Sequence, residues 1–157
     1  MQKFDFKEQF LTRKKIYRFI LSLILIISLI ISLLMFFVKK NTVRRMFVFP
    51  SVSGELVIEY RNLEKNPVQG DVHYFIDEIL LGSQLERTKK IFTFGTEVLS
   101  CFQRDNQLYL DLSVDLLQMG ENVIEIKQGF ELLELNITKN FSDIKKIIFF
   151  VDGKYAY

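Results

Sequence analysis

An uncharged stretch of 20 residues, Phe19–Val38, constrains this chain more than any other feature of its sequence. Serine is the only polar residue type in it. A helix of that length rises about 30 Å, which is the thickness of the hydrocarbon core of a bilayer. The alternative is a helix buried in a protein core, but a helix this long without a polar face has nowhere else to be buried. The sequence therefore predicts a transmembrane helix.

A cleaved secretory signal is a second alternative for the same stretch. The apolar region of a signal peptide has about 7–15 residues and ends near small residues. This stretch is longer, and it ends in LLMFFVKK without small residues. The single cysteine, Cys101, is far from it, so no cysteine is placed for acylation at its end. We therefore expect an uncleaved membrane anchor.

Lysine and arginine residues on both sides of the predicted transmembrane helix set its expected orientation. Six basic residues precede the helix and four follow it before position 46. The basic residues that flank the membrane most closely are Arg13, Lys14, Lys15, Arg18, Lys39 and Lys40. The excess predicts that residues 1–18 are a basic cytoplasmic tail, which suits anionic lipid headgroups. The C-terminal part of this single-pass chain is then expected outside the cytoplasmic membrane.

The residues after position 38 divide into a short tether, 39–45, and one domain, 46–157. Residues 39–157 carry 15 basic and 17 acidic side chains, so the net charge of +2 arises in the tail. A slightly acidic outer domain offers no electrostatic case for nucleic-acid binding. One cysteine cannot form an internal disulfide, so this domain must depend on its apolar core.

Two apolar runs separated by SVSG open the domain, and they predict a hairpin of strands RMFVFP and GELVIEY. In the second run Leu56, Ile58 and Tyr60 alternate with residues of the other face. The segment NPVQGDVHYFIDEILLGS then predicts a helix capped by Asn66 and ended by Gly82. The apolar stripe expected on this helix consists of Val68, Val72, Phe75, Ile76, Ile79 and Leu80.

A second hairpin and a second helix follow. TEVLSCFQ and QLYLDLS, joined at RDN, predict two strands, with Leu108, Leu110 and Leu112 on one side. A helix is expected from about 120 to 140, although Gly129 in its middle costs about 1 kcal/mol against alanine. DIKKIIFFV is the last strand, and its continuous apolar character suits a central position. The order ββ-α-ββ-α-β predicts an α+β two-layer sandwich, one sheet with both helices on one face.

The order of these motifs resembles a known family. FVFP, LVIEYR, IDEILLGS, FGTEVL, LYLDLS and NITKNFSDIKKIIFFVDGK follow one another as in the GerMN domain of spore germination and sporulation proteins. The resemblance covers residues 46–154, with Ser83 where the family usually has proline and no lipobox cysteine. It implies a fold like that of ring-building modules. It also implies an extracytoplasmic interaction module without cofactors, whose partners are other cell-envelope proteins or further copies of itself.

Few side chains of the domain carry the chemistry of an active site. His73 is the only histidine, and no local nucleophile or orienting acid accompanies it as a catalytic triad requires. Asp111 and Asp115 lack a third carboxylate at a spacing that would hold a metal ion. Cys101 lies in a predicted strand, where cysteine behaves as a small hydrophobic residue. The sequence therefore predicts no catalytic, cofactor-binding or metal-binding residues.

The apolar patch IFTF interrupts the polar connection 83–95 and is the candidate contact site, with Ile91, Phe92 and Phe94 as its residues. The alternative interpretation places the patch in the ordinary core. The predicted function is a membrane-anchored, non-catalytic module that binds other envelope proteins or itself. A ligand-binding or sensor-partner domain is the alternative, and it would need a cluster of convergent polar groups. An enzyme such as a cell-wall hydrolase would need a nucleophile with its base, or a metal site.

Overall fold

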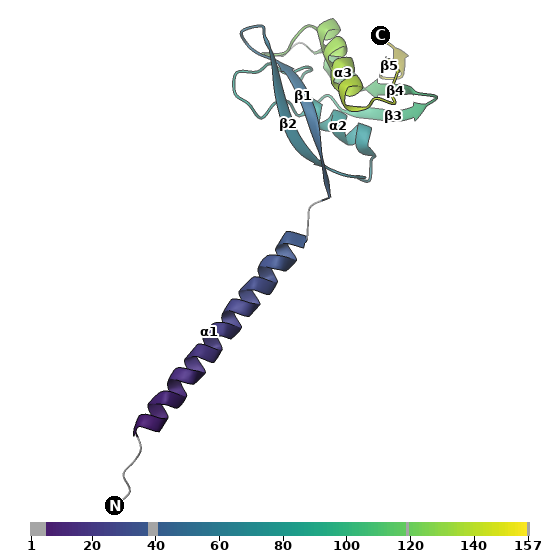
Figure 1. The fold of residues 1–157 in the computed structure, drawn as a ribbon. Coiled ribbons are helices and arrows are strands. Elements are labelled where there is room, and N and C mark those ends of the chain that lie inside the picture. Colours follow the sequence, from purple (N-terminus) through teal and green to yellow (C-terminus); the bar gives the residue numbers. More distant parts are fainter. Residues whose placement is uncertain (1–5, 38–40, 119, 157) are drawn as a thin grey trace, which may run out of the picture. The chain divides into compact units, whose positions relative to one another are not determined.

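The computed structural model describes residues 6–37, 41–118 and 120–156, without the side chains of residues 6–15, 36 and 37. The chain divides into two units, Met1–Lys40 and Asn41–Tyr157. Figure 1 shows the elements of each unit. The flanking residues Lys39 and Lys40 lie outside the described residues, as does the last residue of the predicted transmembrane helix. The side chains of Arg13, Lys14 and Lys15 also lie outside them.

The first unit contains one continuous helix, α1 (Phe6–Phe37). Its segment Ile16–Met35 is long and apolar enough to cross a membrane, with a mean hydropathy of 2.6 and none of it buried by protein. The helix begins well before Phe19 and takes in much of the segment expected to be a tail. The reason is local, because that segment contains no glycine or proline that would interrupt a helix.

The second unit opens with the predicted hairpin, strands β1 (Thr42–Pro50) and β2 (Leu56–Glu64). The two strands pair antiparallel along their whole length, from Thr42 opposite Glu64 to Pro50 opposite Leu56. β1 therefore begins inside the segment expected to be a tether.

The other strands form a four-stranded sheet in the order β3-β4-β5-β6. Its strands are β3 (Val98–Arg104), β4 (Gln107–Leu112), β5 (Lys146–Val151) and β6 (Lys154–Tyr155). Asp105 and Asn106 join β3 to β4 with φ angles of 50° and 61°, which are the conformations that a two-residue hairpin turn requires. β5 pairs parallel with β4 and antiparallel with β6, so the last apolar strand is central, as predicted.

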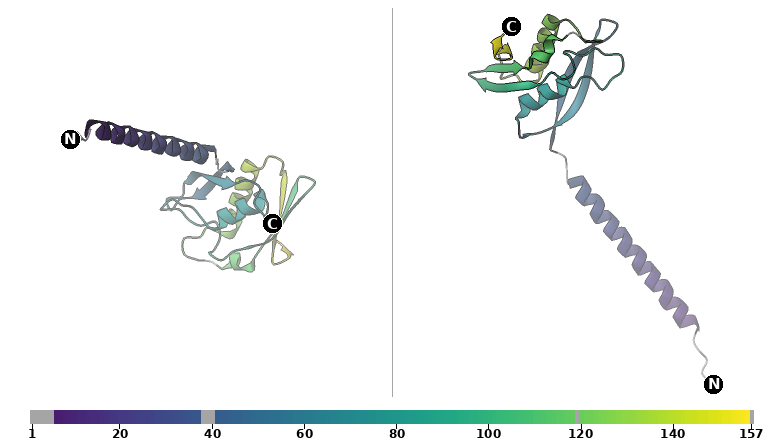
Figure 2. Two further views of the ribbon diagram at one scale, coloured as in Figure 1. Left: turned by 90° about the horizontal axis from the view of Figure 1, so that it is seen from below. Right: turned by 180° about the vertical axis from the view of Figure 1, so that it is seen from behind.

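The two helices lie between the hairpin and the four-stranded sheet (Figures 1 and 2). They are α2 (Asp71–Leu80) and α3 (Ile126–Asn140), and a short 3-10 helix, Val114–Leu117, precedes α3. The α+β class and the order ββ-α-ββ-α-β are confirmed, and a two-residue strand that was not predicted, β6, follows the last predicted strand. The prediction of one sheet is wrong, because the first hairpin forms a sheet of its own.

Two asparagine side chains of α3 explain why the hairpin remains separate. Asn136 accepts a hydrogen bond from the Val48 amide (2.7 Å) and donates one to the Val48 carbonyl (2.9 Å). Asn140, one helical turn later, repeats the pattern with the amide (2.9 Å) and carbonyl (2.6 Å) of Met46. The side chains of Asn136 and Asn140 thus occupy the edge of β1 where a further strand would pair, and they hold α3 beside that edge.

The start of α2 differs from the prediction. The residue before its first turn is Gly70 rather than Asn66. The backbone N–H of Asn66 instead donates a hydrogen bond to the carboxylate of Asp71. Val68 precedes the helix and is fully exposed, so it does not belong to the apolar stripe. Phe75, Ile76 and Ile79 are buried as predicted, and Gly82 (φ 94°) follows the end of the helix.

Phenylalanine rings fill much of the core between these layers. Rings in contact are Phe47–Phe75 (4.7 Å between centroids), Phe75–Phe141 (5.4 Å), Phe92–Phe130 (5.3 Å) and Phe130–Phe149 (4.9 Å). Leu108, Leu110 and Leu112 of β4 face the helices and are buried, as their alternation predicts.

Gly129 allows α3 to approach the segment before β3 closely. A Cβ atom at this position would lie 2.7 Å from Cε1 of Phe92 and 3.0 Å from the carbonyl oxygen of Ile91. Real Cβ atoms do not approach carbon so closely, so a larger residue forces the buried Phe92 ring or the backbone to move. The glycine therefore weakens the helix locally but is required by the packing around it.

We expect Gly129→Ala to destabilise the domain although alanine favours a helix by about 1 kcal/mol. Overpacking of a filled core costs about 1–3 kcal/mol, which exceeds that gain. Urea unfolding of the full-length chain in detergent measures the difference. Gly120→Ala is the matched control, because its Cβ atom would meet nothing closer than Val123 Cγ2 at 3.5 Å. A Gly129→Ala variant as stable as this control would contradict the packing argument.

Candidate functional site

The structure separates the three residues of the predicted contact patch. Ile91 and Phe92 are buried, with 1% and 2% of their surface exposed, whereas Phe94 is 76% exposed. The first two thus follow the alternative interpretation and belong to the core, which corrects their assignment as contact residues. The Phe94 ring lies 4.9 Å from the ammonium group of Lys90. Of the patch, only Phe94 is accessible to a partner, and its role as a contact stays a prediction.

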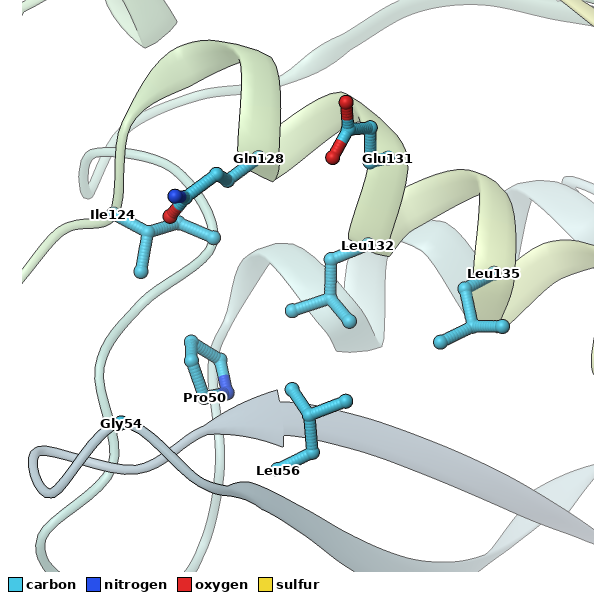
Figure 3. A pocket seen from close by; sticks show the side chains of 8 residues that line it. All are labelled: Pro50, Gly54, Leu56, Ile124, Gln128, Glu131, Leu132 and Leu135. Atoms are coloured by element: carbon cyan, nitrogen blue, oxygen red, sulfur yellow. The ribbon is translucent and has the colours of Figure 1, made fainter.

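A groove that no pattern in the sequence indicates runs between α3 and the hairpin (Figure 3). It has a volume of about 280 Å³. Its lining residues are Pro50, Gly54, Leu56, Ile124, Gln128, Glu131, Leu132 and Leu135. Leu132 and Leu135 point from α3 toward Pro50 and Leu56, while the polar ends of Gln128 and Glu131 lie higher on the helix side. The groove is thus apolar inside and polar at its rim.

The groove continues along β2 as a row of exposed apolar side chains. Leu56, Ile58 and Tyr60 are 58%, 56% and 55% exposed. Successive residues of a strand point to opposite faces, so these three share the outward face. We refer to the groove together with Leu56, Ile58 and Tyr60 as the β2–α3 surface. The alternation in the sequence places the three residues together, but it does not reveal which face of the hairpin is covered.

The inward face of β2 carries charged residues instead, Glu59 and Arg61, and both are buried. Nε of Arg61 donates to Oε1 of Glu59 at 2.6 Å. Its other guanidinium nitrogens donate to the carboxylate of Glu78 (3.2 Å) and to the backbone carbonyls of Glu78 (3.1 Å) and Gly82 (2.6 Å). Arg61 therefore links the C-terminal end of α2 to β2 by hydrogen bonds. Because these bonds require the Arg61 side chain to point into the domain, the opposite face of β2 points outward.

The pKa of the Glu59 carboxyl reflects these contacts. Burial by itself raises the pKa, but hydrogen bonds from Arg61 and Ser83, the charge of Arg61 and the Gln84 amide outweigh it. The pKa of Glu59 therefore lies below its ordinary value, and the carboxylate stays charged at neutral pH. Glu59 and Arg61 form a structural ion pair whose hydrogen-bonding groups are directed into the domain.

The remaining residues singled out in the sequence have structural contacts. His73 lies 3.6 Å from the carboxylate of Asp77, one turn away on α2. Burial, with the charge of Asp77 as a further cause, raises the pKa of the half-buried Cys101 thiol to about 11. The carboxylate of Asp111 accepts a hydrogen bond from the Gly153 amide at 3.1 Å. Within the described part of the chain, no three histidine, cysteine or acidic residues are grouped to hold a metal ion.

A second exposed apolar area lies on the outer face of the four-stranded sheet. Phe102 of β3 is 55% exposed and stacks on Tyr109 of β4, with 5.0 Å between ring centroids. This area belongs to the sheet face that the helices do not cover. Phe102 can serve as a control position for Ile58 of the β2–α3 surface, because the two side chains are almost equally exposed.

The fold, an α+β domain after an apolar helix, is that of a GerMN domain. It is similar to the first GerMN domain of the sporulation protein GerM from Bacillus subtilis, with a TM-score of 0.59 and 16% identity over 73% of this chain and 86% of that one. It is also similar to the tandem GerMN domains of the same protein, with a TM-score of 0.55 and 17% identity over 73% of this chain and 41% of that one. The predicted GerMN-like fold is thereby confirmed.

No family model matches the sequence. The sequence is 30% identical over 106 residues to an "uncharacterized lipoprotein" of Treponema pallidum (strain Nichols), covering 68% of this chain and 79% of that protein. The chain belongs to the family of this lipoprotein. The apolar helix and this relationship together indicate a membrane-associated envelope domain.

Proposed function

We propose that the chain is a single-pass membrane protein whose C-terminal domain is a non-catalytic interaction module outside the cytoplasmic membrane. The length and composition of α1 support an anchor, and the basic residues before its apolar segment support a cytoplasmic N-terminus. The relative's name describes a lipoprotein, which fits a domain held at a membrane. In this chain the apolar helix α1 would serve as the membrane anchor, the role that a covalently attached lipid has in a lipoprotein.

The exposed row on β2 is the observation that carries the proposal. Leu56, Ile58 and Tyr60 face water while Glu59 and Arg61 of the same strand are buried. Contiguous exposed apolar side chains beside a polar rim mark protein interaction sites in soluble domains. The groove beside them is aliphatic inside, which suits the binding of apolar side chains, and among its lining residues Glu131 alone carries an ionisable group. We infer that the β2–α3 surface binds a protein of the cell envelope.

Crosslinking of the tagged full-length chain in intact cells, followed by mass spectrometry, tests this function. We expect the wild-type chain to capture the same envelope protein repeatedly. We expect Ile58→Glu to lower that yield about tenfold or more, because the carboxylate would have to be desolvated at the interface.

Phe102→Glu is the matched control, since it places the same charge at an equally exposed position on the other apolar area. It should leave the yield unchanged. Equal losses in both variants, or no loss in either, would contradict a role for the β2–α3 surface. Capture that depends on Phe102 alone would move the interaction to the outer sheet face.

A further inference from the structure

The two ends of the β2–α3 surface carry opposite charges. At the end near the hairpin turn, Glu55 precedes Leu56 in the chain, and Glu131 lies at the rim of the groove; both side chains are exposed. At the other end, the guanidinium of Arg44 lies 4.4 Å above the Tyr60 ring. Lys139 is also exposed there. We call these the acidic end and the basic end of the surface; the basic end also holds the exposed Glu64, the last residue of β2.

Helical spacing places Lys139 on the groove side of α3. It follows Leu132 by seven residues and Leu135 by four, and residues at these intervals share one helix face. Glu131 is four residues before Leu135 and belongs to the same face. The helix therefore presents an acidic, an apolar and a basic position in succession along the groove.

The hydrogen bonds between α3 and β1 fix the direction of this succession. Asn136 bonds to Val48 and Asn140 bonds to Met46, so α3 runs antiparallel to β1. Because β2 is also antiparallel to β1, α3 and β2 run in the same direction. α3 thus places Glu131 at the end of the surface where Glu55 precedes β2, and Lys139 at the end where Arg44 of β1 lies above the Tyr60 ring.

We propose that the β2–α3 surface binds the same surface of a second copy of the chain, across a two-fold axis. Such an axis brings one patch against its own copy. If the axis is perpendicular to β2, the β2 strands of the two copies run antiparallel. The acidic end of each copy then meets the basic end of the other, and the apolar rows meet in the middle. Charge complementarity of this kind sets the register of an interface and disfavours other partners. The inference rests on the proposed function and names the partner.

Charge reversal at the two ends of α3 tests the second copy directly. Full-length chains with two different tags are co-expressed, and the fraction captured through the other tag after membrane solubilisation is measured. Glu131→Lys and Lys139→Glu should each weaken self-association about tenfold, because each turns an attractive pair into a repulsive one twice per dimer. Both positions are exposed, so unchanged melting temperatures are expected for both variants.

Mixing the two variants provides the decisive comparison. A Glu131→Lys chain paired with a Lys139→Glu chain has opposite charges at both contacts, so co-capture should return to the wild-type level. The double variant in a single chain should recover for the same reason. Lys146→Glu, an exposed charge reversal on β5, is the control and should have no effect.

Loss in the single variants without recovery in the mixture would overturn the second copy as partner. Absence of self-capture in the wild-type chain would overturn it as well. If crosslinking to a different envelope protein still depended on Ile58, the interaction function would stand without the dimer. If neither self-capture nor any partner depended on Ile58, both proposals would fail.

Discussion

Replacing Asn136 by leucine is expected to lower the free energy of unfolding by about 2–6 kcal/mol. Asn136 is completely buried, and its side chain satisfies both the amide and the carbonyl of Val48. Leucine has the same branched shape and leaves no cavity, but both backbone groups of Val48 lose their partner in the interior. Each buried unsatisfied group costs about 1–3 kcal/mol. Urea unfolding of the full-length chain in detergent measures the loss.

Asn140→Leu is the matched comparison for this prediction. Asn140 makes the same pair of bonds to Met46, but it is only partly buried, so water can replace its amide group. We expect a smaller loss there. The Val48 amide should also exchange its hydrogen faster in Asn136→Leu than in the wild-type chain. Equal stability of Asn136→Leu and wild type would show that the edge of β1 needs no side-chain partner.

These asparagines also show why the sequence predicted one sheet where the structure has two. The alternation of Leu108, Leu110 and Leu112 identifies a strand with one covered face, because strand periodicity is a local property. The position of a strand in a sheet depends on what occupies its edge. Asn136 and Asn140 occur in a helical pattern, and nothing local distinguishes an asparagine that bonds a strand from one that faces water.

The start of α2 was misplaced because two local signals competed. Asn66 followed by Pro67 is a typical helix start, and proline suits the first helical position. Gly70, however, adopts a φ of 90°, and the carboxylate of Asp71 accepts a hydrogen bond from the backbone N–H of Asn66, which lies before the helix. Glycine followed by aspartate was the signal that could have placed the start correctly, since glycine interrupts a helix readily.

The candidate site was only partly predictable. Periodicity grouped Leu56, Ile58 and Tyr60 on one face, and the structure keeps them together. Hydropathy alone favours burying that face and exposing Glu59 and Arg61, which is the reverse of the structure. The reversal depends on the carbonyl groups at the end of α2, which are far from β2 in sequence, so a local pattern cannot reveal it. The burial of Ile91 and Phe92 similarly depends on the space left by a glycine of α3.

Arg61→Met is expected to destabilise the domain by about 3–5 kcal/mol at neutral pH. Methionine fills the space of the aliphatic part of arginine, but it leaves the Glu59 carboxylate buried without its cation. The side chains of Glu59 and Arg61 are only 8% and 7% exposed, so water compensates little of the loss. The carbonyl of Gly82 also loses its donor. Denaturant unfolding of the full-length chain measures the effect. Removing both charges, in Glu59→Gln with Arg61→Met, should cost less than Arg61→Met alone.

The pH dependence separates this explanation from a simple packing defect. In the wild-type chain the pKa of Glu59 is below its ordinary value of 4.5, so the unfolded chain binds the proton more readily than the folded one. The stability from this group is therefore present above about pH 4.5 and is lost as the pH falls through the folded pKa. In Arg61→Met the cation is gone and burial remains, so we expect the pKa of Glu59 to rise in the folded state. Its protonation then relieves the buried charge. The stability difference between variant and wild type should shrink on acidification, whereas a difference that is independent of pH would point to packing alone.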